Sequence, residues 1–166
     1  HEITSLMLRF NRDIIMYGEI RTHTEAFELI KAMLRQSRGS LFTFHSSTPE
    51  RTIHDLRQLL MQTGFYTNYQ EAQFDAADAI DIIIQLRLDR NTGRRYVFKV
   101  AEVVAKYETM SFQVHELYRY DKENNGHIVS ETGISKEMQE SCLEYEMTEQ
   151  DIVKVNSLIK SVGVVK

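Results

Sequence analysis

The pattern of apolar and polar positions predicts short strands and helices in alternation over the first half of the chain. Residues 14–17 form a continuous apolar run of the kind that is buried on both faces of a sheet. Apolar positions then recur at helical spacing up to Arg35, with Thr22 or Thr24 as the capping residue. The β-branched and aromatic run at residues 40–45 predicts the next strand.

Two further helices are predicted before the pattern changes. Thr48 followed by Pro49 is a strong helix start, because a hydroxyl caps the first turn and proline fits its first position. That helix is expected to end at Gly64. Asn68 opens another helix that is expected to run through about Asp78.

The second half of the chain has the alternation that is typical of antiparallel strands. The predicted strands are residues 80–86, 95–100 and 111–120 and a short one near Ile128, with turns at 90–93 and 122–126. Residues 135–161 are predicted to be helical, and Thr148 opens the second part of that stretch.

This order of elements predicts an α/β fold with an antiparallel extension and a helical C-terminal tail. We expect residues 1–122 to form the core with its extension. Residues 123–166 are then expected to form a C-terminal hairpin and the helical tail.

Composition excludes several classes of function. The net charge is −4 and there is no basic run, which argues against a nucleic-acid partner. No apolar stretch reaches the ~18 residues of a membrane span and no signal peptide opens the chain, so we expect a cytoplasmic protein without direct membrane insertion. Cys142 is the only cysteine, which fits a reducing compartment. The histidines show no metal-ligand spacing, and no metal site is expected.

The residues that point to chemistry follow the first predicted strand. Glu19 comes directly after the apolar run 14–17 and Gly18, and ligands of open α/β sheets bind at the carboxyl ends of strands. A carboxylate there can orient or deprotonate the water that attacks a phosphate. By itself the pattern leaves two interpretations, such an acid or a solvated strand end.

Four segments in the same order resemble the type II/type IV secretion ATPase family. The first contains Leu8, Arg9 and Asp13 and the sequence IMYGEIR, and it resembles the family's Walker B segment. The others are residues 39–47 (GSLFTFHSS), which resemble its histidine box, and residues 79–85 and 94–103, which resemble the hairpin that follows. Ser40 is most similar to the Tad/Flp-pilus and conjugation-type branch. The four segments together cover roughly residues 5 to 135. Four motifs in the same order are far more specific evidence for a family than one motif is.

The resemblance implies a RecA-like P-loop ATPase core and assigns roles to four residues. Glu19 matches the Walker B glutamate that activates the hydrolytic water, and His45 matches the main histidine of the histidine box. An imidazole at that place can hydrogen-bond the γ-phosphate or Glu19. Arg21 and Arg9 match charges that respond to phosphate or to a neighbouring subunit, although either can also form a surface ion pair.

The chain also departs from the family pattern. It contains no G-x-x-x-x-G-K-[ST] segment, and therefore no phosphate-binding lysine and no hydroxyl for Mg²⁺. The acidic box of the family is absent as well. We expect this chain to be a piece of a longer protein that uses ATP and Mg²⁺, with a natural degenerate paralogue as the alternative. On its own the chain, a partial core that lacks the P-loop strand, is expected neither to bind nor to hydrolyse ATP, because the backbone nest and lysine that hold the phosphates are missing.

The function implied by the resemblance is that of a hexameric motor. The intact protein is expected to couple ATP hydrolysis to filament assembly or substrate translocation. It would work at the inner face of the cell membrane, as a homohexamer on an inner-membrane platform protein. The alternative is a non-catalytic interaction module of a secretion or conjugation system, with the same fold and no nucleotide.

Overall fold

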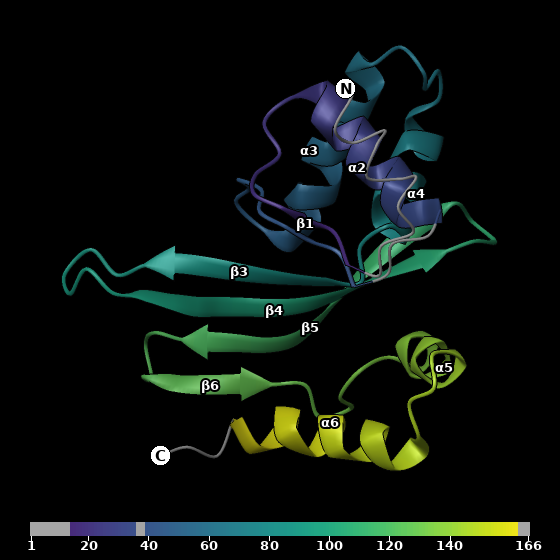
Figure 1. Cartoon of the computed structure of the whole chain (residues 1–166). Coiled ribbons are helices and arrows are strands. Elements are labelled where there is room, and N and C mark those ends of the chain that lie inside the picture. Colours follow the sequence, from purple (N-terminus) through teal and green to yellow (C-terminus); the bar gives the residue numbers. More distant parts are fainter. Residues whose placement is uncertain (1–13, 36–38, 163–166) are drawn as a thin grey trace. The chain divides into compact units, whose positions relative to one another are not determined.

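The computed structural model describes residues 14–35 and 39–162 (Figure 1). Within these residues the chain is a mixed α/β protein with five helices, a small parallel strand pair and a four-stranded antiparallel sheet. The predicted α/β class, the antiparallel run and the C-terminal helices are therefore confirmed. No helix in the described ranges is long and apolar enough to cross a membrane.

The helices and strands follow the order that the sequence pattern predicts. The helices are α2 (His23–Arg35), α3 (Pro49–Gln62), α4 (Tyr69–Asp78), α5 (Lys136–Glu144) and α6 (Glu149–Val162). The strands are β1 (Met16–Tyr17), β2 (Leu41–Phe42), β3 (Ile82–Leu88), β4 (Arg95–Lys106), β5 (Ser111–Asp121) and β6 (Gly126–Val129).

Side-chain caps determine where several helices begin. At α2 the Glu25 amide donates to Thr22 Oγ1 at 3.3 Å, and the Thr22 amide donates to Glu25 Oε2 at 2.9 Å. This reciprocal pair satisfies two amides that the first turn would otherwise leave without a partner. Thr22, and not Thr24, is therefore the cap. At α3 Thr48 accepts from the amide of Arg51 at 3.1 Å, as its position before Pro49 predicts.

The described chain forms two compact units. The first contains residues 14–80 without 36–38, together with residues 105–112 at the β4–β5 turn. The second contains residues 81–104 and 113–162. The division at residue 122 that the sequence suggests stays a prediction.

The core of the first unit lies between α2, α3 and α4. Its fully buried apolar side chains recur at helical spacing: Leu29 and Ile30 on α2, and Ile53, Leu56 and Leu60 on α3. Each such side chain contributes about 1.5–3 kcal/mol when it is removed from water. This packing fixes α2, which lies between β1 and β2 in the sequence, against α3 and α4.

A polar contact joins α2 to α4 beside this core. Lys31 Nζ lies 2.7 Å from Asp75 Oδ2, and the hydroxyl of Tyr66 donates to the same oxygen at 2.5 Å. Burial, followed by the hydrogen bond to Asp75, raises the pKa of Tyr66 to about 12. Asp75 therefore accepts from two donors, one on α2 and one in the loop between α3 and α4.

The first strand corrects one prediction. The expectation that residues 14–17 are buried on both faces is wrong, because Ile14 and Met16 are 60% and 74% exposed while Ile15 is buried. The alternation of exposed and buried positions shows that β1 is covered on one face only. The predicted strand 40–45 is likewise shorter in the structure, where β2 contains only Leu41–Phe42.

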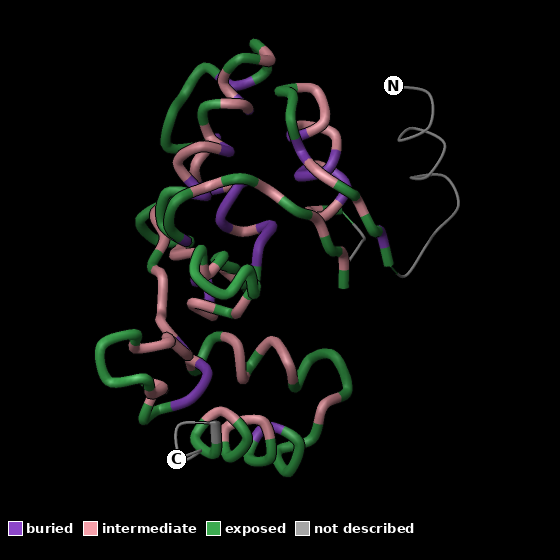
Figure 2. The backbone as a smooth tube through the Cα atoms, turned by 90° about the vertical axis from the view of Figure 1, so that its left-hand side faces the viewer, coloured by how far each residue is buried: buried purple, intermediate pink, exposed green. Residues whose placement is uncertain are grey.

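The second unit is an antiparallel sheet in the order β3-β4-β5-β6 with helices against it. Leu117 of β5 packs with Ile134 and Ile152 in a small buried cluster. Ile152 of α6 is buried, and the other residues from 149 to 161 are half-buried or exposed. Figure 2 shows this distribution along the helix near the C-terminal end. The predicted strand 80–86 occurs at β3, two residues later.

A buried carboxylate anchors α5 to this sheet. Glu102 is 1% exposed and accepts hydrogen bonds from the Ser135 amide at 2.9 Å and from the Ser135 hydroxyl. Ser135 in turn caps α5 by accepting from the amide of Met138 at 3.1 Å. One serine thus completes the first turn of α5 and satisfies a carboxylate that would be costly to bury alone.

We predict that Ser135→Ala lowers the free energy of unfolding by about 1–2 kcal/mol, because it removes a helix cap and a partner of buried Glu102. Urea unfolding followed by circular dichroism measures the change. The matched control is Ser157→Ala, since Ser157 is exposed on α6 and its hydroxyl bonds only the carbonyl of Lys154 in the described structure. Equal losses in the two variants would contradict the anchoring role.

Candidate functional site

The candidate site lies at the carboxyl ends of the parallel strands. Met16 of β1 pairs with Leu41 of β2, and Tyr17 pairs with Phe42. The Leu41 amide donates to the Ile15 carbonyl at 2.8 Å, which fixes the register. Because the two strands run in the same direction, the residues that follow them leave the same edge of the pair.

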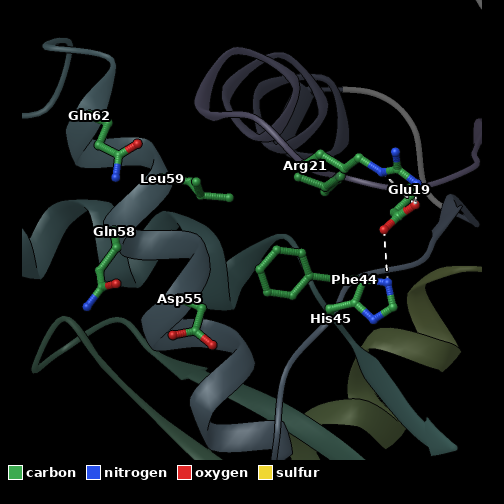
Figure 3. Close-up of a pocket in the computed structure, with 9 residues that line it drawn as sticks. Glu19, Arg21, Phe44, His45, Asp55, Gln58, Leu59 and Gln62 are labelled. Atoms are coloured by element: carbon green, nitrogen blue, oxygen red, sulfur yellow. Dashed lines mark hydrogen bonds and ion pairs between the residues drawn. The ribbon is translucent and has the colours of Figure 1, made fainter.

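Glu19 and His45 meet at this edge. His45 Nε2 lies 2.9 Å from Glu19 Oε1, as the dashed line in Figure 3 marks. The backbone beneath them stays paired beyond the strands, since the Ile20 amide donates to the Thr43 carbonyl at 3.1 Å and the Thr43 hydroxyl donates to the Gly18 carbonyl. The structure thus brings together the two residues that were expected to meet, and their catalytic roles stay predictions.

Arg21 occupies the other oxygen of the same carboxylate. Its Nε donates to Glu19 Oε2 at 2.8 Å, so both Glu19 oxygens have a partner. The hydrogen bond from Arg21 holds the pKa of Glu19 below its ordinary value, and His45 adds a smaller effect in the same direction. Glu19 is therefore ionised at neutral pH.

The three side chains differ in their exposure to solvent. The Glu19 side chain is only 24% exposed, whereas the side chains of Arg21 and His45 are 74% and 91% exposed. Exposed groups exchange partners with little cost in desolvation. The site thus consists of a carboxylate in a fixed position and two groups that an incoming anion can reach from solvent.

A cleft of about 380 Å³ opens beside the pair (Figure 3). Glu19, Arg21, Phe44 and His45 line one wall. The other wall is formed by four residues of α3: Asp55, Gln58, Leu59 and Gln62. One helix therefore supplies a carboxylate and two amides to the same cleft as Glu19.

Asp55 is the polar residue of this second wall that the structure fixes most firmly. It accepts from the Ser46 hydroxyl at 3.0 Å and from Arg51 Nε at 2.7 Å. The sequence pattern does not single out Asp55, because polar residues between the apolar positions of a helix usually form its solvated face. Its i,i+4 spacing from Arg51, directly after the histidine-box segment, is the only local signal for its position.

Arg9, the remaining candidate, lies outside the described residues. Across residues 14–35 and 39–162, no group of three or more histidine, cysteine, aspartate or glutamate side chains is placed to hold a metal ion.

No protein-family model matches the chain, and no curated protein matches it either.

We predict that Arg21→Gln raises the pKa of Glu19 toward its ordinary value, because the guanidinium is the main group that stabilises the ionised carboxylate. A titration of the Glu19 carboxyl carbon by NMR measures this shift in the 166-residue chain. Arg35→Gln is the control, since Arg35 is an exposed residue in the last turn of α2. An unchanged Glu19 titration in Arg21→Gln would contradict the geometry of the pair.

Proposed function

We propose that this chain forms part of the ATPase core of a secretion or pilus-assembly motor, from the Walker B strand onward. In this proposal the β1–β2 pair belongs to a RecA-like parallel sheet. The observation that carries the proposal is the 2.9 Å contact between Glu19 and His45, which follow two adjacent parallel strands. Open α/β sheets bind their ligands at such an edge, and both residues match the motif positions of the secretion ATPases.

The charged side chains of the site provide some of the groups that are needed to bind and hydrolyse a phosphate. Arg21 and His45 can donate to phosphate oxygens, and Glu19 can accept a proton from an attacking water or orient it. The cleft of about 380 Å³ beside them has room for a ligand group. The backbone nest and lysine that hold most of a nucleotide's phosphates are absent from these 166 residues. The proposal therefore requires that ATP and Mg²⁺ be held mainly by another segment of a longer protein.

Within this proposal Arg21 has a second task. It donates to Glu19 Oε2, and a γ-phosphate would compete with Glu19 for the guanidinium. Release of Arg21 would leave the carboxylate oxygen free to accept from water. Such a motor works as a homohexamer, and it couples this hydrolysis to filament assembly or translocation on an inner-membrane platform protein.

One observation favours a second candidate, a non-catalytic interaction module. Ile14, Met16 and Leu41 are large apolar side chains exposed on the β1–β2 segment. An exposed apolar surface of this kind marks a place where another protein segment docks. In that case Arg21, Glu19 and His45 form an ion-pair network whose task is structural.

We predict that Glu19→Gln abolishes ATP turnover in a longer protein that carries this chain together with a phosphate-binding loop. The amide keeps the shape of the carboxylate but cannot accept the proton of the attacking water, so we expect kcat to fall by ~10²–10⁴-fold. The ATP dissociation constant, measured by calorimetry, is expected to change by less than ~3-fold. Glu50→Gln, at an exposed position in the first turn of α3, is the control. Normal turnover in Glu19→Gln would contradict the catalytic role of Glu19, whereas an unaltered protein without any ATP turnover would favour the interaction module.

We predict that His45→Ala lowers kcat more than it weakens ATP binding. Loss of the imidazole frees Glu19 Oε1, so the carboxylate loses its orientation, while the separate phosphate-binding loop that holds most of the phosphates is unchanged. Steady-state kinetics and calorimetry give the two values separately, and His23→Ala, exposed at the start of α2, is the control. A loss of binding that equals the loss of turnover would contradict the assigned role.

A further inference from the structure

The end of the β3–β4 hairpin is rich in exposed arginine. We call residues 86–95 the arginine hairpin end; its four arginines, all exposed, are Arg87, Arg90, Arg94 and Arg95. Asp89 is the one acid in this segment, and it holds the turn by accepting from the Asn91 amide at 3.0 Å and from the Thr92 hydroxyl at 2.8 Å. Leu86 and Leu88 add exposed apolar side chains. The segment is positive in a chain whose net charge is −4.

The opposite charge gathers on α5 and the start of α6. We call residues 137–151 the acidic helix surface; its six acidic residues, all exposed, are Glu137, Glu140, Glu144, Glu146, Glu149 and Asp151. This segment contains no lysine or arginine. Leu143 and Tyr145 are exposed beside the acids. Each surface therefore combines a net charge of one sign with two exposed large apolar side chains.

The two surfaces lie at opposite ends of the second unit. Ser135, which caps α5, bonds to Glu102, and Glu102 is seven residues along β4 from Arg95. At the usual rise of a strand this separation is about 23 Å. Figure 1 shows the hairpin end and α5 at opposite ends of the β3–β4 ribbon. One copy therefore cannot bring its own two surfaces together, whereas two copies can.

We propose that the arginine hairpin end of one copy docks on the acidic helix surface of a second copy. The contact joins two different surfaces, so each copy keeps one free surface of each kind and further copies can add head to tail. Contacts of this type close into a ring when the rotation between copies permits it. The proposal goes beyond ATP hydrolysis and concerns the second unit alone.

The test reverses the charge of each surface separately in the full 166-residue chain. One variant carries Arg90→Glu with Arg94→Glu, which gives the hairpin end a net charge of −1. The other carries Glu137→Arg, Glu140→Arg, Glu144→Arg and Glu146→Arg, which gives the helix surface a net charge of +2. Sedimentation velocity at low ionic strength, without nucleotide, measures association. Each variant alone is expected to lose association by ~10-fold or more, because like charges now face each other. An equimolar mixture is expected to restore it, since every hairpin end then meets a helix surface of opposite charge.

The matched control is Arg35→Glu with Lys160→Glu, which changes the net charge as much as the hairpin variant but lies outside both surfaces. It is expected to associate as the unaltered chain does. A chain that stays monomeric at every concentration overturns the proposal. So does a mixture that fails to restore association, as it would if the arginines bind an anionic membrane and not a second copy. Because no nucleotide is present, these outcomes leave the ATPase proposal untouched.

Discussion

The backbone pairing of β1 with β2 is the constraint on which the candidate site depends. Glu19 and His45 are far apart along the chain, and only the parallel register brings their side chains to one edge. The hydrogen bond from the Leu41 amide to the Ile15 carbonyl sets that register. A parallel pair needs a long crossover connection, and α2 supplies it by burying Ile30 and its neighbours against α3. The apolar core of the first unit therefore determines the geometry of the site.

The charges of Glu19 and its two partners determine which ligands and reactions the site can support. Glu19 is held between a guanidinium and an imidazole, and the hydrogen bond from Arg21 keeps its pKa low. An ionised and oriented carboxylate is suited to position a water molecule. The Arg21 side chain is exposed, and ion pairs of exposed groups are weak in water. A multiply charged anion can therefore take Arg21 from Glu19 at small cost, whereas a neutral ligand cannot. The proposal of a phosphate ligand rests on this difference.

The sequence predicts the features of this structure that depend on local chemistry. A cap at Thr22 or Thr24 is expected from the two hydroxyls before the apolar positions of α2, and the structure selects Thr22. The contact of Glu19 with His45 agrees with the rule that residues after parallel strands leave the same edge. The exposure of Met16 could not be predicted, because it depends on which elements cover each face of β1–β2 and not on the run itself. The place of Asp55 in the cleft depends in the same way on how α3 packs. The local sequence pattern does not show which elements pack against one another.

In the proposed function, Glu19 and His45 form one side of a phosphate-binding site. The most direct test is an NMR titration of a longer protein, which includes this chain and a phosphate-binding loop, with a non-hydrolysable ATP analogue and Mg²⁺. We expect the signals of the Glu19 carboxyl carbon and the His45 ring to shift together as the analogue saturates the protein, while the signal of His127 on β6 stays unchanged. Saturation of the protein without any shift at Glu19 and His45 would contradict this expectation.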